Sequence, residues 1–200
     1  MAKGQGKVTP KHETDGVDVY MCQIQWIDEK ETLQIANSPP RTANLTFSGA
    51  DLNYLARVLY AESSGAAMLP DVGDRRTEKE ALLNVFYFRL NRKGYPRNDY
   101  IAKTFSRVCD ARGQFEALQP TPKPKFLNSA NPKFKTLKQG ECADLQEAID
   151  AVKAFMSSGP NQKYVYDNFR AAKQDGMGTT IGKSRFWLSV KGKEDSDAVR

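Results

Sequence analysis

Glu62 is the residue of this sequence whose type and position point most directly to chemistry. It follows Leu55 by seven residues, Val58 by four and Leu59 by three, so a helix here carries its carboxyl group on the apolar face. The same spacing places Glu62 in the last helical turn before Gly65, next to the negative end of the helix dipole. Burial and the dipole both raise the pKa of a carboxyl group, and an acid kept protonated near neutral pH can protonate a glycosidic oxygen.

The helix that positions Glu62 is predicted to begin after Ser48. Ser48 can accept a backbone N–H, and Asp51, three residues later, completes the spacing of a capping box. Gly65 is predicted to end the helix, because glycine readily takes the left-handed conformation of a helix end. Taken by itself, this helix favours a solvent-exposed Glu62 carboxylate over one whose pKa is shifted. Helix ends are usually exposed to water, and carboxyl groups with shifted pKa values are uncommon.

The composition is that of an ordinary globular chain of one domain. Hydrophobic residues make up 40% and charged residues 27% of the 200 residues. The net charge of +6 allows an anionic partner, such as nucleic acid, acidic lipid or a cell-wall polymer, and does not choose among them. No apolar run approaches the roughly 20 residues of a membrane span, and no secretory signal is visible near the N-terminus. We therefore expect a protein made in the cytoplasm, without a membrane span.

Histidine and cysteine are too few for several kinds of active site. His12 is the only histidine and lies in a polar tail, which argues against a Ser-His-Asp or Cys-His set and against a histidine metal site. The three cysteines, Cys22, Cys109 and Cys142, form no C-x-x-C motif, so no zinc or redox site is expected. One internal disulfide is allowed, and Cys109 with Cys142 is a candidate pair. We expect neither a metal nor a cofactor.

Helical periodicity and stop signals predict three further helices. The second helix is predicted to begin at Thr77, where Glu80 completes a capping box, and to end at Asn91 and Arg92. A shorter helix is predicted over residues 99–108 and an amphipathic one over residues 142–157.

Short polar–apolar alternation predicts strands at both ends of the chain. Residues 17–27 alternate in two phases, and residues 32–36 could return as a second strand, after a disordered tail at residues 1–16. Residues 17–38 then form a small β appendage, either a docking element for a carrier or partner, or a packing flap. Residues 179–188 predict a final strand or hairpin.

Two loops are candidates for the rim of a site. Residues 63–76 contain Asp71 and Asp74, which are turn residues in the main interpretation and a second, water-positioning carboxylate in the alternative. Residues 119–138 interleave lysines with two phenylalanines. Such a loop could bind single-stranded nucleic acid, line a groove for an anionic glycan, or simply be solvated.

A glycine at position 113 permits a tight turn that presents the next two residues. The amide of Gln114 offers donors and an acceptor for sugar hydroxyls. Phe115, taken alone, suits the core better than a sugar-stacking position.

Several short motifs follow one another in a recognisable order. Residues 55–62 read Leu-Ala-Arg-Val-Leu-Tyr-Ala-Glu. Later motifs are Leu90-Asn91-Arg92 with Tyr95-Pro96, Gly113-Gln114-Phe115, the helix from Ala148 to Gly159, the stretch from Tyr164 to Asn168, and Ile181-Gly182 with Phe186-Trp187. In type and order these resemble the motifs of the SleB-type cell-wall hydrolases, the spore-cortex-lytic family, over about residues 50–188.

This resemblance implies a lysozyme-like, mainly helical fold that cleaves the glycan strands of peptidoglycan. Most members are thought to be lytic transglycosylases, and the glutamate that acts as their acid matches Glu62. The residues that would position the sugar are Gln114, Phe115, Tyr166, Asn168 and Asn91. Two departures concern the rim of the site: Ser184 stands near the family's usual histidine, and the stretch after Glu62 lacks a second glutamate.

The expected fold class is mainly α (α+β), a lysozyme-like helical domain with a small β element and an N-terminal β appendage. The expected divisions are a tail and appendage at residues 1–45, a catalytic domain at 46–190 and a charged tail at 191–200. The alternatives are a hydrolytic muramidase, which needs a second carboxylate, and a non-enzymatic basic module that binds cell wall or nucleic acid.

The expected partners are peptidoglycan strands rather than nucleic acid. A chain without an export signal that resembles a wall-acting enzyme also suggests an injected antibacterial toxin or a phage lysis or tail component. Such a protein would act in the periplasm or cell wall, and a toxin would have an inhibitory partner protein or a secretion-machine carrier.

Overall fold

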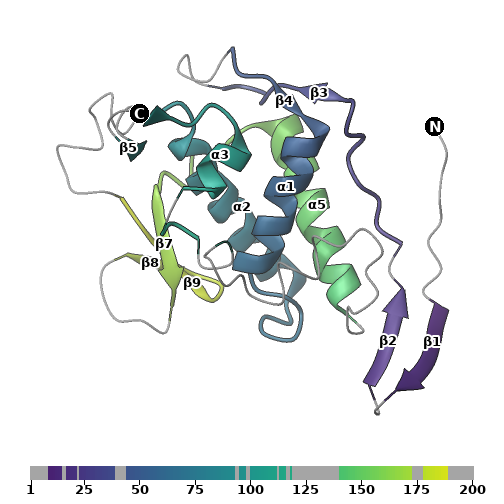
Figure 1. The fold of residues 1–200 in the computed structure, drawn as a ribbon. Coiled ribbons are helices and arrows are strands. Elements are labelled where there is room, and N and C mark those ends of the chain that lie inside the picture. The colour runs from purple at the N-terminus through teal and green to yellow at the C-terminus, as the bar shows by residue number, and fades with distance from the viewer. Residues whose placement is uncertain are drawn as a thin grey trace.

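The computed structural model describes residues 9–14, 17–21, 23–38, 44–92, 95–97, 100–111, 113–115, 118, 140–172 and 178–188. Three longer helices, α1 (Gly49–Glu62), α2 (Val72–Arg89) and α5 (Glu141–Ser158), pack together with the short α3 (Phe105–Cys109). Figure 1 shows a small sheet at one side of these helices and the hairpin of β1 (Thr9–Thr14) and β2 (Val17–Met21) standing apart at the other. The architecture is a mixture of helix and small sheets, as expected for the α+β class.

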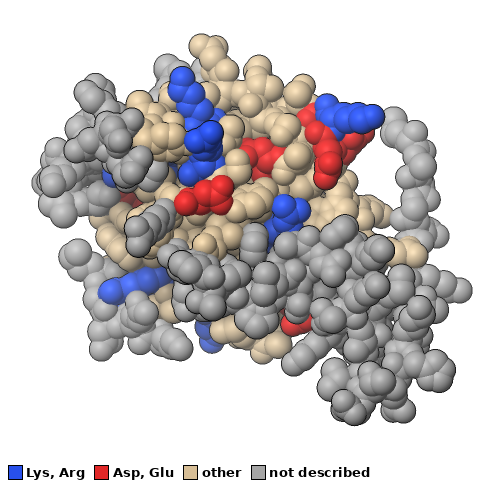
Figure 2. Space-filling view, viewed as in Figure 1, with Lys and Arg blue, Asp and Glu red and all other residues tan. Residues whose placement is uncertain are grey.

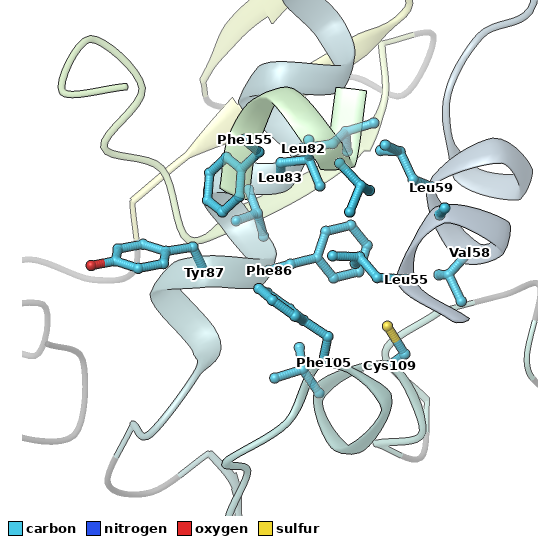
Figure 3. Close-up of a cluster of buried hydrophobic side chains, with 14 of the residues drawn as sticks. Leu55, Val58, Leu59, Leu82, Leu83, Phe86, Tyr87, Phe105, Cys109 and Phe155 are labelled. Carbon is cyan, nitrogen blue, oxygen red and sulfur yellow. The ribbon is translucent and has the colours of Figure 1, made fainter. Parts of the chain in front are cut away.

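The core lies where the three longer helices meet. Figure 3 shows side chains of α1 facing those of α2, with α3 and α5 closing the cluster. Its fully buried members include Leu55, Val58, Leu59, Leu82, Phe86, Phe105 and Cys109. The apolar face predicted for α1 is therefore confirmed, and Glu62 continues that face at its C-terminal end.

The N-terminus of α1 is capped as predicted, with one difference. Ser48 Oγ accepts the backbone N–H of Asp51 at 3.2 Å. The Asp51 carboxyl group, however, accepts the backbone N–H groups of Phe105 at 2.9 Å and Ser106 at 2.8 Å. The capping-box interpretation was therefore only half right, because Asp51 caps the neighbouring helix α3 and fixes it against α1.

The C-terminus of α1 does not use the glycine as predicted. The helix ends at Glu62, and Ser63 follows with an extended backbone at φ −90°. Gly65 does not have a positive φ. It is needed for space instead, because a Cβ there would lie 2.1 Å from Oδ2 of Asp144 on α5.

Helix α2 begins five residues earlier than predicted. Asp71 caps it by accepting the N–H of Asp74 at 2.8 Å, so the helix starts at Val72 rather than at Thr77. A helix takes the first good cap that tertiary packing allows, and the aspartates predicted as turn residues belong to its first turn. Its end at Arg89 lies close to the predicted end, and Asn91 follows with a positive φ of 49°.

The helix predicted over residues 99–108 is shorter than expected. β5 (Pro96–Arg97) and β6 (Tyr100–Ile101) pair as a small antiparallel ladder, and only Phe105–Cys109 is helical. Thr104 caps this helix by accepting the N–H of Arg107.

The N-terminal strands pair differently from the prediction. β2 pairs with β1, which lies inside the stretch predicted as a disordered tail, while residues 23–27 are not a strand. β3 (Thr32–Leu33) pairs with β4 (Phe47–Ser48). Ile27 exchanges two hydrogen bonds with the side chain of Asn53 on α1. Because Ile27 and Ile35 are buried in the main core, this part behaves as a packing flap.

The C-terminal part agrees with the prediction. α5 is amphipathic and ends at Gly159, whose φ is +76°. β7 (Asn168–Ala171), β9 (Ser184–Trp187) and β8 (Thr179–Ile181) form an antiparallel sheet in the order β7-β9-β8. The predicted basic loop at 119–138 and the charged tail at 191–200 lie outside the described residues. No helix in the described part of the chain combines the length and apolarity that crossing a membrane requires.

Candidate active site

Glu62 is the last residue of α1 and is half-buried. The last turn of the helix carries no basic residue that would offset the negative end of the dipole. Burial raises the pKa of the Cys109 thiol on α3, and the charges of Asp51, Asp110 and Glu62 add to this effect. The Glu62 carboxyl group therefore lies close enough to α3 to act on it electrostatically.

The segment after Glu62, residues 63–71, is called here the α1–α2 loop, and buried side chains of α2 hold its first part. The backbone N–H of Ser64 donates to Glu78 Oε2 at 2.8 Å, and its carbonyl accepts from Lys79 Nζ at 3.1 Å. Glu78 and Lys79 are almost completely buried, at 0% and 1% exposure. Two adjacent charged residues thus bind both backbone polar groups of Ser64, two residues beyond Glu62.

The second part of the α1–α2 loop is held in a similar way. Arg75 donates to the carbonyl groups of Leu69 at 2.8 Å and Pro70 at 2.7 Å. Asp144 Oδ1 accepts the N–H of Ala66 at 2.9 Å. The loop is therefore fixed by side chains of both α2 and α5.

Glu147 of α5 joins these anchors into one network. It accepts from Arg75 Nε at 3.0 Å and from Lys79 Nζ at 2.9 Å. Both cationic side chains are buried, and each therefore needs this carboxyl group as a partner.

Glu78 also reaches the closing hairpin of the chain. Its Oε1 accepts the N–H of Lys183 at 3.0 Å and the hydroxyl of Ser184 at 2.8 Å. One buried carboxyl group thus connects the loop that follows Glu62 to the turn between β8 and β9. Ser184 stands near the position at which the family that the sequence resembles usually has histidine, and here its hydroxyl donates to the Glu78 carboxyl group.

A second junction forms around Asp167, which is 1% exposed. Its carbonyl accepts from Arg89 Nε at 3.0 Å, and its carboxyl group accepts from Arg92 at 3.2 Å and from Asn168 Nδ2 at 2.7 Å. Arg89 also lies over the rings of Tyr95 and Phe115, at 5.4 and 5.5 Å. The end of α2, the turn at 113–115 and the start of β7 therefore meet here.

Three of the predicted sugar-binding residues lie at this junction or beside it. Asn168 is half-buried and bonded to Asp167, and Asn91 is half-buried next to Arg92. Gln114 is exposed in a turn where Gly113 has a φ of +78°, as the sequence predicted.

Phe115 does not fit the sugar-binding role that the resemblance implied. Its ring is 1% exposed and stacks on Phe86 with ring centroids 4.9 Å apart. A ring enclosed in this way cannot offer its face to a sugar. It fixes the 113–115 turn to the core instead, as its residue type alone had suggested.

Tyr166 lies at a cavity of about 370 Å³ between α2 and the closing sheet. Its ring is 5.8 Å from that of Phe186, and the residue is half-buried. The cavity is lined further by Asp74 and Thr77 of α2, by Lys163, and by Thr179 and Thr180 of β8.

Sequence reasoning missed Glu78, although a signal for it was present. Glu78 precedes Ala81 by three residues, Leu82 by four and Val85 by seven, so it lies on the apolar face of α2 just as Glu62 lies on that of α1. The role of Asp167 had no comparable signal, because its two arginine partners lie more than seventy positions away in the sequence.

The predicted candidate pair of cysteines is not formed. Cys109 is a free, buried thiol, and Cys142 is disulfide-bonded. Cys109 fills a place in the core between α1 and α3, which leaves it no access to another cysteine (Figure 3). Within the described residues, no group of three or more His, Cys, Asp or Glu side chains could hold a metal ion.

Comparisons of the chain with protein-family models, with curated proteins and with solved structures gave no match.

Proposed function

We propose that this protein cleaves the glycan strands of peptidoglycan, between N-acetylmuramic acid and N-acetylglucosamine, with Glu62 as the single general acid and base. The proposed fold is lysozyme-like. The observation that supports this best is the convergence of the resembling motifs. Arg92 of the motif at 90–92 bonds Asp167 of the motif at 164–168, and Arg89 joins Asp167 to Phe115 of the motif at 113–115. The closing hairpin is bonded through Glu78 to the loop that follows Glu62.

The proposed reaction is a lytic transglycosylation. Glu62 gives its proton to the glycosidic oxygen while the bond from that oxygen to C1 of the muramic acid breaks. The resulting carboxylate takes the proton of the muramyl 6-hydroxyl as its oxygen bonds to C1, which closes a 1,6-anhydro ring. Glu62 regains its proton, so the reaction needs neither water nor a second carboxylate, unlike that of two-carboxylate hydrolases.

The anchored loop suits this chemistry because a general acid must stay within hydrogen-bond distance of the leaving oxygen. The bonds from Glu78 and Lys79 to Ser64 limit the movement of the backbone just beyond Glu62. Gln114, Asn168 and Asn91, with Tyr166, are proposed to bind the sugar hydroxyl and amide groups.

The alternative of hydrolysis depends on a second carboxylate. Asp71 is used as the cap of α2, so it is not a candidate for activating water. Asp74 keeps this alternative open, because its carboxyl group lines the same cavity as Tyr166.

A basic module for nucleic acid is the other alternative. Figure 2 shows acidic and basic side chains interspersed on the described part of the visible face, rather than a continuous basic patch. An interspersed surface of this kind gives little of the sequence-independent attraction on which such binding depends, so the described part of this face does not support the module. We therefore favour the enzyme.

The proposed place of action is the cell wall or periplasm. Disulfides persist in oxidising compartments and are rare in the cytoplasm, so the disulfide at Cys142 supports a site outside it. Delivery as a toxin or as a phage lysis or tail component, with an inhibitory partner, is part of the same proposal.

The experiment is a mass-spectrometric analysis of muropeptides released from purified sacculi. Transglycosylation predicts products that end in 1,6-anhydro-muramic acid, 18 Da lighter than hydrolytic products because one water is not added, a general consequence of the two reactions. Products with reducing ends would support the hydrolytic alternative. No release of muropeptides, together with salt-dependent binding to nucleic acid, would support the basic module.

A further inference from the structure

The cavity beside Tyr166 contains several polar side chains that the protein itself does not use. Six of its lining residues have side chains without a hydrogen bond or ion pair anywhere in the described part of the chain: Asp74, Thr77, Lys163, Tyr166, Thr179 and Thr180. Asp74, Lys163, Thr179 and Thr180 are exposed and the other two are half-buried, so these groups are hydrated in the free protein and are available to orient a ligand in the cavity.

Both signs of charge are present in this cavity. Asp74 lies in the first turn of α2, and the Lys163 ammonium group lies 5.6 Å from the ring of Tyr164. N-acetylated sugars are uncharged at their ring substituents and need neither an acid nor a base for recognition. A ligand that carries a carboxylate and an amine is matched by this pair, and the hydroxyl groups that line the same cavity are available to peptide or acyl oxygens.

We propose that this cavity binds the peptide stem attached to the muramic acid, with Lys163 on a stem carboxylate and Asp74 on the free amine of a diamino acid. This inference rests on the proposed function. In uncross-linked strands the stem carries both groups, so each of its charges has an oppositely charged side chain in the cavity. Tyr166 lines the cavity and is also a proposed sugar-binding residue, so sugar and stem sites adjoin one another.

The test compares two substrates: glycan strands with uncross-linked stems, and the same strands stripped by an amidase. Asp74→Asn and Lys163→Gln remove one charge each. Lys30→Gln and Asp150→Asn are matched controls, because they make the same changes at exposed positions outside this cavity. Wild type is expected to have a higher kcat/KM on the stem-bearing strands.

Each cavity variant is expected to lower kcat/KM on stem-bearing strands about 5- to 10-fold, through KM, as for one lost charge-assisted hydrogen bond. Lys163→Gln is expected to leave the rate on stripped strands unchanged, and the controls change neither rate. Equal losses on both substrates would overturn the proposal, and for Asp74→Asn they would assign that residue to the chemistry. Equal wild-type rates on the two substrates would overturn it as well.

A binding measurement separates this inference from the proposed function. The full chain carrying Glu62→Gln is titrated calorimetrically with a free stem tripeptide, and with the same tripeptide acetylated on its side-chain amine. Two results together support the cavity as a stem site, even if neither substrate is cleaved. Acetylation of the tripeptide weakens its binding to Glu62→Gln, and acetylation has no effect on binding when Asp74→Asn is added. Absence of binding overturns the inference, whereas cleavage of neither substrate contradicts only the proposed function.

Discussion

Replacing Glu78 is expected to damage the protein more than replacing any exposed acidic residue. The Glu78 side chain is completely buried and accepts three hydrogen bonds, from the backbone N–H groups of Ser64 and Lys183 and from the Ser184 hydroxyl. In Glu78→Ala these donors lose their acceptor, at about 1–3 kcal/mol each, and part of the loss is recovered by relaxation. We expect the free energy of unfolding to fall by about 3–5 kcal/mol.

Such a loss is a large share of the roughly 5–15 kcal/mol by which a domain is stable. It lowers the Tm of a chain of this size by roughly 6–20 °C. Glu78→Gln keeps one acceptor oxygen but turns an N–H group toward one of the donors, so about 1–2 kcal/mol is expected. The measurement is urea unfolding followed by circular dichroism, with wild type in parallel.

Glu80→Gln is the matched control on the same helix. Glu80 uses one oxygen, Oε1, to accept from Asn161 at 3.0 Å, and glutamine can keep that bond. We expect its stability to stay within about 0.5 kcal/mol of wild type. Ordinary surface substitutions change the free energy of unfolding by about 1 kcal/mol or less. If Glu78→Ala also stays within about 1 kcal/mol of wild type, the view that this carboxyl group holds the α1–α2 loop to the closing hairpin is refuted.

Four further outcomes follow from the packing and from the junction at Asp167. Gly65→Ala is expected to lower the free energy of unfolding by about 1–3 kcal/mol, because its Cβ would lie 2.1 Å from Asp144, and an unchanged urea midpoint would contradict this close approach. Asp167→Ala is expected to lose about 3–5 kcal/mol, since it removes a buried carboxyl group that pairs with Arg92 and accepts from Asn168; a loss below 1 kcal/mol by the same assay would speak against the junction. Cys109 is expected to resist a thiol reagent in the native protein at pH 8 and to react after unfolding, because burial raises the pKa of its thiol. For the same reason the free energy of unfolding is expected to fall as the pH rises past 9, where the thiol ionises only in the unfolded state, and Cys109→Ala should lessen this fall. Rapid labelling of the native protein would contradict the burial of Cys109, and an unchanged pH profile in Cys109→Ala would contradict the raised pKa.

Local patterns in the sequence were sufficient for the elements whose cause is local. The apolar face of α1 with its Ser48 cap, the amphipathic α5 with its glycine end, and the β8–β9 hairpin were all predicted from spacing and turn residues. The position of Glu62 at the end of the apolar face was predicted by the same means, whereas its role as the acid was implied by the resemblance and stays a prediction.

The features that the sequence did not predict depend on partners far away in the chain. Asp51 has the spacing of a capping box, yet its carboxyl group lies against α3 and caps that helix instead. β2 alternates clearly, but periodicity cannot name β1 as its partner. Gly65 is explained by Asp144, which is 79 positions later, rather than by its own backbone preference.

The candidate site shows the same division. The residue type of Gln114 suggested polar contacts, and Asn91 and Asn168 were implied by the family resemblance, whereas the roles of Glu78 and Asp167 required three-dimensional information. Buried charges of this kind are rarely chosen by sequence reasoning, because charged residues are usually exposed.

The central claim is that Glu62 alone supplies and recovers the proton. The most direct measurement is the rate of muropeptide release from purified sacculi by wild type, Glu62→Gln and the exposed control Glu31→Gln, with urea unfolding of all three. We predict that Glu62→Gln loses at least about 100-fold in rate while it unfolds like wild type, and that Glu31→Gln retains full activity. Release by a folded Glu62→Gln variant at the wild-type rate would contradict the claim.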